Sequence, residues 1–254
     1  MARTIVITGA GSGIGKAIAH HLALNGDKLV LLGRNLDRLA QTRDSSHNPA
    51  WHVCYSCDIR KPDQLRHALR QSGVDSIYGV VVNSGVGGEN RYGPGDRWPE
   101  ILETNLTGSY NTVQECLPYL KTSRVGNEYR KIVFISSILA RLGVPGYSAY
   151  CASKAGLLGL MRSLAHELTQ DGILVNALCP GWVNTDMTQQ GLQGFADALK
   201  ITKEEAFQKA MSVVPLGKIS EPQEVARLVG YLMADDQTSI TGQTIDINNG
   251  ALMP

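Results

Sequence analysis

The chain has 254 residues, with 24 basic and 23 acidic side chains and a formal net charge of +1. This length suits one large α/β domain or two small ones, and either can bury a sizeable core. The Lys and Arg positions are dispersed along the chain, which argues against a nucleic-acid partner. No apolar run reaches membrane-spanning length, and the first residues lead directly into a strand-like segment without room for a signal peptide. We therefore expect a cytoplasmic protein with no membrane partner.

A glycine-rich turn follows the first predicted strand, residues 4–8, and precedes a predicted helix over residues 16–24. Gly9, Gly13 and Gly15 let the backbone turn tightly and approach a pyrophosphate, whose charge the helix amino terminus favours. The spacing is GxxxGxG, which differs from the common dinucleotide fingerprint GxGxxG. The pattern predicts a cofactor-binding turn over a merely flexible one. Its intervening residues Ser12 and Ile14 belong to the same predicted site.

The second predicted strand, residues 28–32, ends at Gly33 and Arg34, about where an NAD-binding fold places a carboxylate for the ribose hydroxyls. No Asp or Glu stands there. Gly33 leaves space, and the Arg34 guanidinium offers a planar, permanently charged fork to a 2′-phosphate. The pattern predicts NADP(H) in preference to NAD(H). The alternative is a surface arginine that opens the next helix.

Five cysteines, an odd number, suit a reducing compartment and free thiols. Cys54 and Cys57 form a CxxC, but in a strand-like run a separation of three points the two side chains to opposite faces. The pattern favours buried thiols over a redox disulfide or a chelating pair, and we expect no metal site.

Polar residues also follow the third and fourth predicted strands. Ligands of a parallel sheet bind at the carboxyl ends of its strands, so Asp58 can accept from an adenine amino group and Gly85 can admit the ribose. Ile59 and Asn83 adjoin these positions. Read without context, each is equally compatible with a turn residue that caps the next helix.

Tyr150 and Lys154 stand four positions apart in a predicted helix over residues 150–169, so their side chains share a face. A nearby lysine cation lowers the pKa of a tyrosine by favouring the phenolate, which makes the tyrosine a usable general acid or base. Ser137 ends the fifth predicted strand, where its hydroxyl can hold a substrate carbonyl oxygen in the same crevice. The alternatives are a solvated helix face for the pair and a helix cap for the serine.

Strands alternate with helices along the chain, without a linker, a low-complexity tract or an internal repeat. This alternation predicts one doubly wound, Rossmann-like α/β domain over residues 1–254, with about seven parallel strands and helices on both faces. Residues 188–214 are more polar and partly helical, as a substrate lid would be. The strands are predicted at residues 4–8, 28–32, 51–57, 77–82, 131–135, 173–178 and 244–248.

Apolar side chains surround most of the predicted helix 150–169, so it should be buried on more than one side. The sheet covers one face, and we expect a second subunit on another. The apolar residues of helix 150–169 are Leu157, Leu158, Leu160, Met161, Leu164 and Leu168.

Two further helices are predicted over residues 98–117 and 220–233. The second has a capping-box pattern at Ser220 and Gln223.

A series of spaced positions follows one family's order along the chain: the glycine signature at 8–15, Asn83-Ser84-Gly85, Asn105, Ser137, Tyr150 with Lys154, and Pro180-Gly181 with Thr185. Nearly from end to end, the chain therefore resembles the short-chain dehydrogenase/reductase family. The resemblance implies that Tyr150 is the acid or base, and that Ser137 orients the substrate oxygen. It implies that Lys154 holds the nicotinamide ribose while lowering the tyrosine pKa, and that the protein is a homotetramer or homodimer.

By the same resemblance, Asn105 supports a water-linked proton relay and Thr185 binds the carboxamide, with Pro180, Gly181 and Val183 in the same cofactor segment. Two positions depart from the family pattern. Val82 replaces a second Asn, and Asn248-Asn249-Gly250 replaces the commoner Asp-Gly-Gly.

Residues 98–110, 204–207 and 214–217 resemble ketoreductases of fatty-acid and polyketide type. Carrier-protein-dependent reductases of that type carry basic residues where this chain has Glu128 and Asp171, which would repel an acidic carrier. We therefore expect a coenzyme A ester or a free small ketone as the substrate.

The leading interpretation is an NADP(H)-linked carbonyl reductase in which Tyr150 protonates the developing alkoxide. The same residues run backwards in an alcohol, hydroxy-acid or sugar dehydrogenase, which is the alternative enzyme. A nucleotide-binding scaffold need not keep the tyrosine, lysine and serine, and all three are present. The loops that set specificity carry no transferable code. Candidate residues of an apolar substrate wall are Leu139, Val144, Tyr147, Trp182 and Met187.

Overall fold

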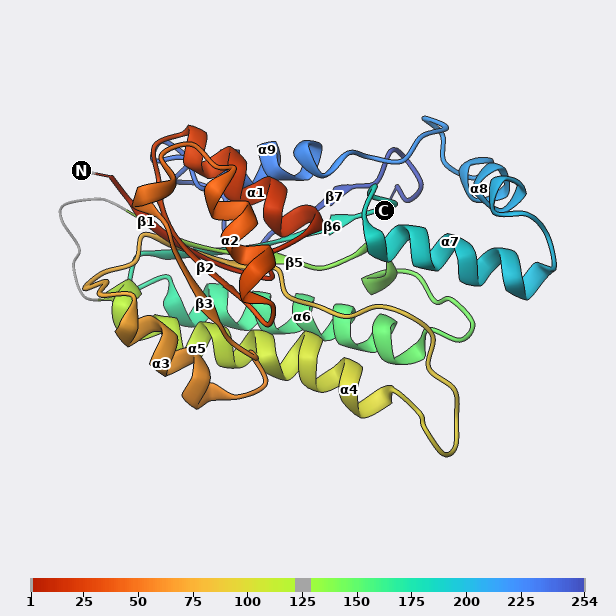
Figure 1. Ribbon diagram of the computed structural model, residues 1–254, viewed down its shortest axis with the longest axis horizontal. Helices are drawn as coiled ribbons and strands as arrows, with labels where there is room; N and C mark the ends of the chain where they lie inside the picture. The colour runs from red at the N-terminus through yellow and green to blue at the C-terminus, as the bar shows by residue number, and fades with distance from the viewer. Residues whose placement is uncertain (1, 122–128, 254) are drawn as a thin grey trace.

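A seven-stranded, all-parallel sheet forms the centre of the computed structural model, which describes residues 2–121 and 129–253 (Figure 1). The strand order is β3-β2-β1-β4-β5-β6-β7, so the winding reverses between β1 and β4. The predicted doubly wound α/β fold is confirmed. The strands are β1 Thr4–Thr8, β2 Lys28–Gly33, β3 Val53–Ser56, β4 Gly79–Val82, β5 Arg130–Ile135, β6 Ile173–Pro180 and β7 Thr244–Ile247.

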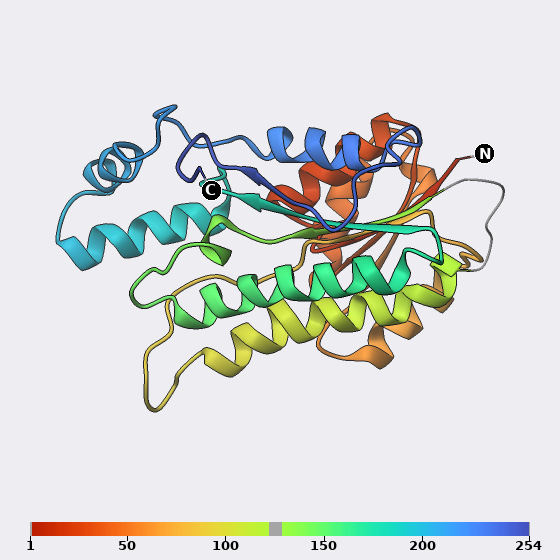
Figure 2. The ribbon, with the colours of Figure 1, turned by 180° about the vertical axis from the view of Figure 1, so that it is seen from behind.

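Helices cover both faces of this sheet (Figures 1 and 2). α1, α2 and α9 lie on one face, and α3, α5 and α6 lie on the other, each group enclosing its own apolar core. Because both faces are buried, the strands are almost continuously apolar, as is usual for parallel sheets. These helices are α1 Gly13–Leu24, α2 Leu36–Asp44, α3 Pro62–Gln71, α5 Gly108–Lys121, α6 Ser148–Leu168 and α9 Pro222–Leu232.

Several predicted elements differ from the structure, among them β4, which begins at Gly79 instead of residue 77, and α1, which begins at Gly13 instead of residue 16. β3 begins only at Val53, because Pro49–Trp51 form a short 3₁₀ helix, η1. The helix predicted over 98–117 consists of α4 (Trp98–Leu102), a π-helical turn η2 (Glu103–Thr107) and α5, which runs on to Lys121. The capping box of α9 is formed by Glu221 and Glu224, one residue after the predicted pair, because Ser220 is drawn into a β-bridge with Val183.

Two helices, α7 (Asp186–Leu199) and α8 (Lys203–Met211), project beyond the sheet at the end where the carboxyl termini of its strands lie (Figures 1 and 2). They pack together through a small apolar cluster of their own around Leu192 and Met211. This segment coincides with the predicted lid at 188–214, and its closing over substrate stays a prediction.

The apolar residues around α6 are mostly covered within the chain. All of them except Leu160 are buried against the sheet and α5, so they do not by themselves require a second subunit. Cys57 lies in the same core, whereas Cys54 packs against the core on the opposite face, as expected for a CxxC in a strand.

All five cysteines are free. Across residues 2–121 and 129–253, no helix is long and apolar enough to cross a membrane. In the same part of the chain no three His, Cys, Asp or Glu side chains are grouped so that they could hold a metal ion.

Candidate active site

A cleft of about 320 Å³ opens at the carboxyl ends of the strands, where the winding reverses between β1 and β4. Open α/β sheets bind their ligands in this crevice. The predicted residues that line it are Gly9, Ser12, Gly13, Ile14, Arg34, Asp58, Ile59, Asn83, Gly85, Tyr150, Lys154 and Thr185. The predicted residues that do not line it are Gly15, Asn105, Ser137, Pro180, Gly181 and Val183.

The glycine-rich turn between β1 and α1 depends on positions that require a residue without a side chain. Gly9 (φ +67°) and Gly13 (φ +51°) adopt left-handed conformations that favour glycine. A Cβ on Gly15 would overlap the Gly9 carbonyl oxygen and the Asn83 amide, so Gly15 shapes the turn from behind the cleft. Ser12, the N-cap residue of α1, makes no side-chain cap bond. The amino terminus of α1 is thus available to a phosphate group.

Asn83 fastens the end of β4 to the end of β1. Its amide donates to the Thr8 carbonyl oxygen (3.0 Å). Its backbone N–H and that of Ser84 donate to the Thr8 hydroxyl (3.0 and 3.1 Å). Because these bonds occupy the Asn83 amide, the residue fixes the floor of the cleft by holding Thr8 and the glycine turn in place.

Arg34 lies exposed at the mouth of the cleft, and its guanidinium forms no hydrogen bond or ion pair within the described residues. Arg38, in the first turn of α2, lines the same wall, with Nη1 4.0 Å from the Asp186 carboxylate. Gly11 allows Arg38 to pack closely against the glycine-rich turn, because a Cβ on Gly11 would lie 3.0 Å from the Arg38 Cβ. The mouth of the cleft therefore holds two cations where a single one was predicted.

Asp58 lines the cleft, but its carboxylate is already engaged. The Arg60 guanidinium donates to both Asp58 oxygens, with Nε 3.0 Å from each. These bonds hold the pKa of Asp58 below its ordinary value. The predicted acceptor for an adenine amino group is thus a charged, paired carboxylate, and its remaining lone pairs are the ones a ligand can reach.

Tyr150 and Lys154 extend from the first two turns of α6 into the cleft, with the Lys154 Nζ 5.7 Å from the centroid of the tyrosine ring. The ammonium donates to the Ile135 carbonyl oxygen at the end of β5 (2.9 Å). Burial lowers the pKa of Lys154 to about 8 and raises the pKa of Tyr150 to about 12. The predicted lowering of the tyrosine pKa is therefore wrong for this state of the protein, because burial of the phenol dominates.

Ser137 follows β5 and is buried beside Tyr150. Its hydroxyl hydrogen-bonds with the phenol, which opposes the effect of burial on the tyrosine pKa. It also accepts from the Leu139 N–H (3.1 Å), which caps the 3₁₀ turn η3, Ile138–Ala140. Both readings of this serine apply, since one hydroxyl caps a turn and contacts the phenol.

Asn105 lies inside the π-helical turn η2 and is fully buried. Its side chain accepts from the Val86 N–H (2.8 Å) and donates to the Val86 carbonyl oxygen (3.0 Å). A Cβ on Gly85 would lie 3.2 Å from the Asn105 Oδ1 and 3.4 Å from the Lys154 Nζ. Asn105 therefore holds the β4 exit loop against the lysine, and its part in a water-linked relay stays a prediction.

Thr185 and Met187, at the start of α7, form part of the cleft lining. Thr185 caps α7 by accepting from the Thr188 N–H (3.3 Å). Its methyl group would lie 3.1 Å from a Cβ on Gly13. Two residues later the Met187 sulfur would lie 2.9 Å from a Cβ on Gly87, in the loop after β4. This first turn of α7 thus spans the cleft from the glycine turn to the opposite wall.

The start of this segment supports the turn without lining the cleft. Pro180 ends β6, and Val183 is buried beside Ser220. Gly181 passes so close to Asn248 that a Cβ would lie 3.0 Å from the Asn248 Cα. Direct contacts of these three residues with a cofactor stay predictions.

Comparison with known proteins matches this arrangement to a family. A family profile described as short chain dehydrogenase matches residues 3–195, which carry the glycine turn, Tyr150 and Lys154. The chain belongs to the short chain dehydrogenase family. It is an oxidoreductase that acts on CH–OH or carbonyl groups.

Its relatives within the short chain dehydrogenases cover almost the whole chain. A protein of the granaticin polyketide synthase from Streptomyces violaceoruber, named as a ketoacyl reductase, is 35% identical over 96% of this chain and 91% of its own length. The 3-oxoacyl-(acyl-carrier-protein) reductase FabG of Rickettsia prowazekii is 32% identical over 99% of this chain and 97% of its own. A crystal structure of an actinorhodin polyketide ketoreductase with NADPH has a TM-score of 0.91 and 29% identity, covering 98% of this chain and 97% of that one.

Sequence reasoning missed one residue that positions α6, the helix that carries Tyr150 and Lys154, in this short chain dehydrogenase. Asn90, in the loop after β4, is 5% exposed. Its Oδ1 accepts from the Ala149 N–H (2.9 Å) and the Ser148 hydroxyl (3.2 Å). Tyr147, the N-cap residue of α6, makes no side-chain cap bond, so Asn90 caps this helix from a distant part of the chain.

Only one of the five residues predicted to form an apolar substrate wall lines the cleft. Met187 lines it, whereas the other four candidates do not. Trp182 packs instead against the small core under α7 and α8. The remaining candidates, Leu139, Val144 and Tyr147, lie between Ser137 and the start of α6, outside the lining of the cleft.

Proposed function

We propose that this protein reduces a carbonyl group of a 3-oxoacyl thioester or a small ketone with NADPH. The observation that carries the proposal is the placement of Tyr150 and Lys154, with Ser137 beside the phenol but outside the lining, at one end of a cleft whose other end offers a glycine turn and two arginines. The relatives named as ketoacyl and 3-oxoacyl reductases support this substrate class.

The cleft fits a phosphate-bearing dinucleotide. Gly9 and Gly13 expose backbone at the amino terminus of α1, where a pyrophosphate is favoured. Arg34 and Arg38 stand at the mouth, and a 2′-phosphate bound there would gain charge-assisted hydrogen bonds. Such bonds are worth roughly 1.5–3 kcal/mol, so kcat/KM with NADPH should exceed that with NADH by at least about tenfold. The NADPH bound to the actinorhodin ketoreductase supports this preference.

The protonation state of the site favours reduction. With a pKa of about 12, Tyr150 holds its proton at neutral pH and is ready to donate it to a developing alkoxide. The Ser137 hydroxyl, next to the phenol, orients the same oxygen. Lys154, protonated below about pH 8, supplies a cation next to the phenol in the first two turns of α6. When bound, NADPH supplies the hydride.

The carrier of the substrate depends on the charge around β5 and β6. Glu128, which we expect to repel an acidic carrier protein, lies outside the described residues. Asp171 forms an ion pair with Lys121 (2.7 Å), so it repels such a carrier less than an unpaired carboxylate would. We keep the proposal of a coenzyme A ester or a free ketone, which a comparison of coenzyme A and carrier-protein thioesters of one acyl chain tests directly.

We further propose a homotetramer or homodimer in the cytoplasm. Up to Gly159, α6 exposes only small residues, Ala152, Ala155 and Gly159, which allow close packing of another helix, whereas beyond it the helix exposes polar side chains such as Arg162 and Glu167. Light scattering at micromolar concentration checks the assembly, and a species of about 27 kDa contradicts it.

Turnover of a carbonyl panel by the wild type and by Tyr150→Phe tests the proposed function. The wild type should oxidise NADPH in the presence of 3-oxoacyl thioesters or small ketones. Tyr150→Phe should lower kcat roughly 10²- to 10⁴-fold, because it lacks the acidic proton, while still binding NADPH in a fluorescence titration. A variant that retains near wild-type kcat contradicts the role of Tyr150, and a wild type that reduces no member of the panel contradicts the substrate class.

A further inference from the structure

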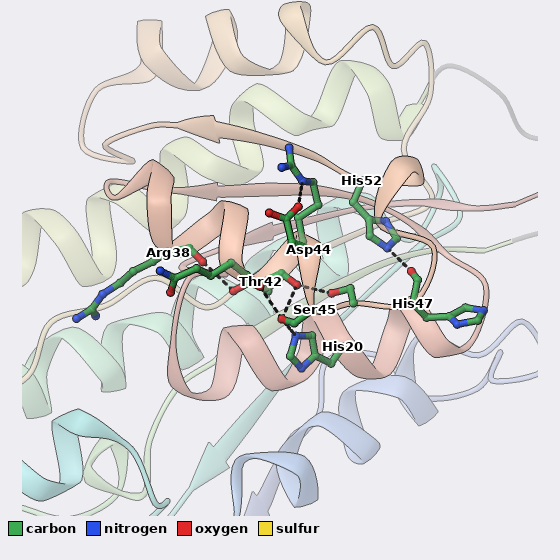
Figure 3. A network of polar contacts seen from close by, with 10 residues as sticks. His20, Arg38, Thr42, Asp44, Ser45, His47 and His52 are labelled. Carbon is green, nitrogen blue, oxygen red and sulfur yellow. Dashed lines mark hydrogen bonds and ion pairs between the residues drawn. The ribbon is translucent and has the colours of Figure 1, made fainter.

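Thr42, in α2, is a fully buried polar residue outside the lining of the cleft. Its hydroxyl lies 3.1 Å from the Ala10 carbonyl oxygen, inside the glycine-rich turn. It also lies 3.0 Å from the Arg38 carbonyl oxygen, one turn earlier in its own helix (Figure 3). A hydroxyl has one hydrogen to donate, so the two carbonyls share a single donor. Thr42 therefore bonds α2 to the turn that faces the cofactor phosphates.

The other polar contacts of this network hold α2 elsewhere. The Ser45 hydroxyl donates to the Gln41 carbonyl oxygen (2.5 Å) and pairs with the His20 Nε2 of α1 (3.1 Å) (Figure 3). The Ser46 hydroxyl donates to the Thr42 carbonyl oxygen (2.6 Å). These bonds fix the carboxyl-terminal end of α2. Among the described residues of α2, Thr42 is the one whose side chain donates to the backbone of the glycine-rich turn.

The bond joins the two segments whose residues line the mouth of the cleft. One is the glycine-rich turn that contains Ala10, and the other holds Arg34, just before α2, and Arg38 in its first turn. Ala10 is fully buried, so its carbonyl oxygen without the Thr42 hydroxyl is a buried acceptor with a lost partner. Such a group is costly, and the turn and the helix relieve the cost by moving relative to each other. Small shifts of a cationic group weaken charge-assisted bonds whose geometry is narrow.

We propose that Thr42 is a positioning residue for cofactor selection. Its hydroxyl fixes the spacing between the glycine-rich turn and the two arginines, and this spacing sets the preference for a cofactor with a 2′-phosphate. The inference rests on the proposed use of NADPH. Thr42 acts through Arg34 and Arg38 and touches neither the substrate nor the reacting atoms.

Thr42→Val is the informative variant, because valine keeps the shape of threonine and lacks the hydroxyl. Its kcat/KM with NADPH should fall, by no more than the roughly 10- to 150-fold that the charge-assisted bonds to the 2′-phosphate are worth. Its kcat/KM with NADH should change much less, so the ratio of the two values narrows. Thr42→Ser, which restores the hydroxyl, should return the ratio to that of the wild type. Thr42→Cys, a weaker donor, should give an intermediate ratio and replaces Thr42→Val if that variant does not fold.

Ser46→Ala is the matched control, because it removes a buried hydroxyl from the same network without touching the glycine-rich turn. It should lower the melting temperature and leave the cofactor ratio unchanged. In an Arg38→Ala background, Thr42→Val should lower the ratio of kcat/KM with NADPH to kcat/KM with NADH by a smaller factor than it does in the wild type. The reason is that one of the arginines through which Thr42 acts is then absent.

Two results overturn different statements. A wild-type ratio near one contradicts the proposed NADPH preference before any variant is measured. A high wild-type ratio that Thr42→Val or Thr42→Cys leaves unchanged, with only a lower melting temperature, shows that Thr42 stabilises the fold and does not position the arginines.

Discussion

Replacing Lys154 by methionine should make the protein more stable while removing its activity. Lys154 is 4% exposed, and its ammonium donates to the Ile135 carbonyl oxygen. No carboxylate forms an ion pair with it among the described residues, and burial lowers its pKa from 10.5 to about 8. The folded chain thus carries a charge that would be better solvated in the unfolded chain, a cost typical of functional sites.

The pKa shift gives the size and the sign of this cost. A change from 10.5 to about 8 corresponds to roughly 3 kcal/mol against the charged form in the folded state. Below pH 8 the lysine is protonated in both states, so the cost is present in full. Between pH 8 and 10.5 the unfolded chain binds the extra proton, and the free energy of unfolding rises with pH. Methionine removes the charge but also a hydrogen bond worth about 1 kcal/mol, leaving a net gain of about 1–2 kcal/mol at pH 7.

For a chain of this length such a gain raises the melting temperature by roughly 2–8 °C. Thermal unfolding at pH 7 and at pH 10 measures it, and the two proteins should become nearly equal in stability at the higher pH. The kcat for carbonyl reduction should fall by at least roughly 10²-fold. Lys61→Met is the control, because Lys61 is exposed and its removal should leave stability nearly unchanged. A Lys154→Met variant that is less stable than the wild type at pH 7 refutes the reasoning.

Arg34→Asp should reverse the cofactor preference, because the new carboxylate repels a 2′-phosphate and can accept hydrogen bonds from ribose hydroxyls. Measuring kcat/KM with NADPH and with NADH tests this, and an unchanged ratio of the two values contradicts it. Gly15→Ala should abolish NADPH binding in a titration, because the added Cβ overlaps the Gly9 carbonyl oxygen, whereas Gly194→Ala, where an added Cβ meets nothing within 4 Å, should bind normally. Asn90→Ala should lower the free energy of unfolding by about 1 kcal/mol in denaturant and should lower kcat, because it removes the cap of α6. Asn90→Asp keeps an acceptor oxygen for this cap. Equal stabilities of Asn90→Ala and the wild type would show that the cap contributes nothing.

The parts of the site that depend on local sequence could be predicted. Gly9 and Gly13 have positive φ angles, and this requirement is visible in a strand–glycine–helix pattern. Tyr150 and Lys154 share a helix face, so their meeting in the cleft follows from helical spacing. The ends of parallel strands meet at one edge of the sheet, which explains why Asp58 and the residues after β4 also line the cleft.

The parts that depend on contacts between distant residues could not be predicted. Asn90 caps a helix that begins far along the chain, and no local pattern marks it. Arg38 reaches the cleft because Gly11 has no side chain, a fact of packing between two elements. The pKa of Tyr150 rises because the phenol is buried, and burial is a property of the assembled fold. Helical spacing correctly placed Tyr150 and Lys154 together in the cleft and gave the wrong direction for the shift in the tyrosine pKa.

The charges that the fold leaves uncompensated indicate the kind of ligand that completes the cleft. Asp58, the carboxylate in the lining next to β3, is neutralised by Arg60, whereas Arg34 has no partner within the described residues and α1 has no side-chain cap. The mouth of the cleft therefore favours an anion, while the deep end at Lys154 offers a buried N–H donor instead of a solvated charge. A ligand with phosphates at one end and neutral hydroxyls at the other satisfies both ends at once. A simple polyphosphate satisfies only the first, so the order of charges along the cleft supports the proposed dinucleotide cofactor.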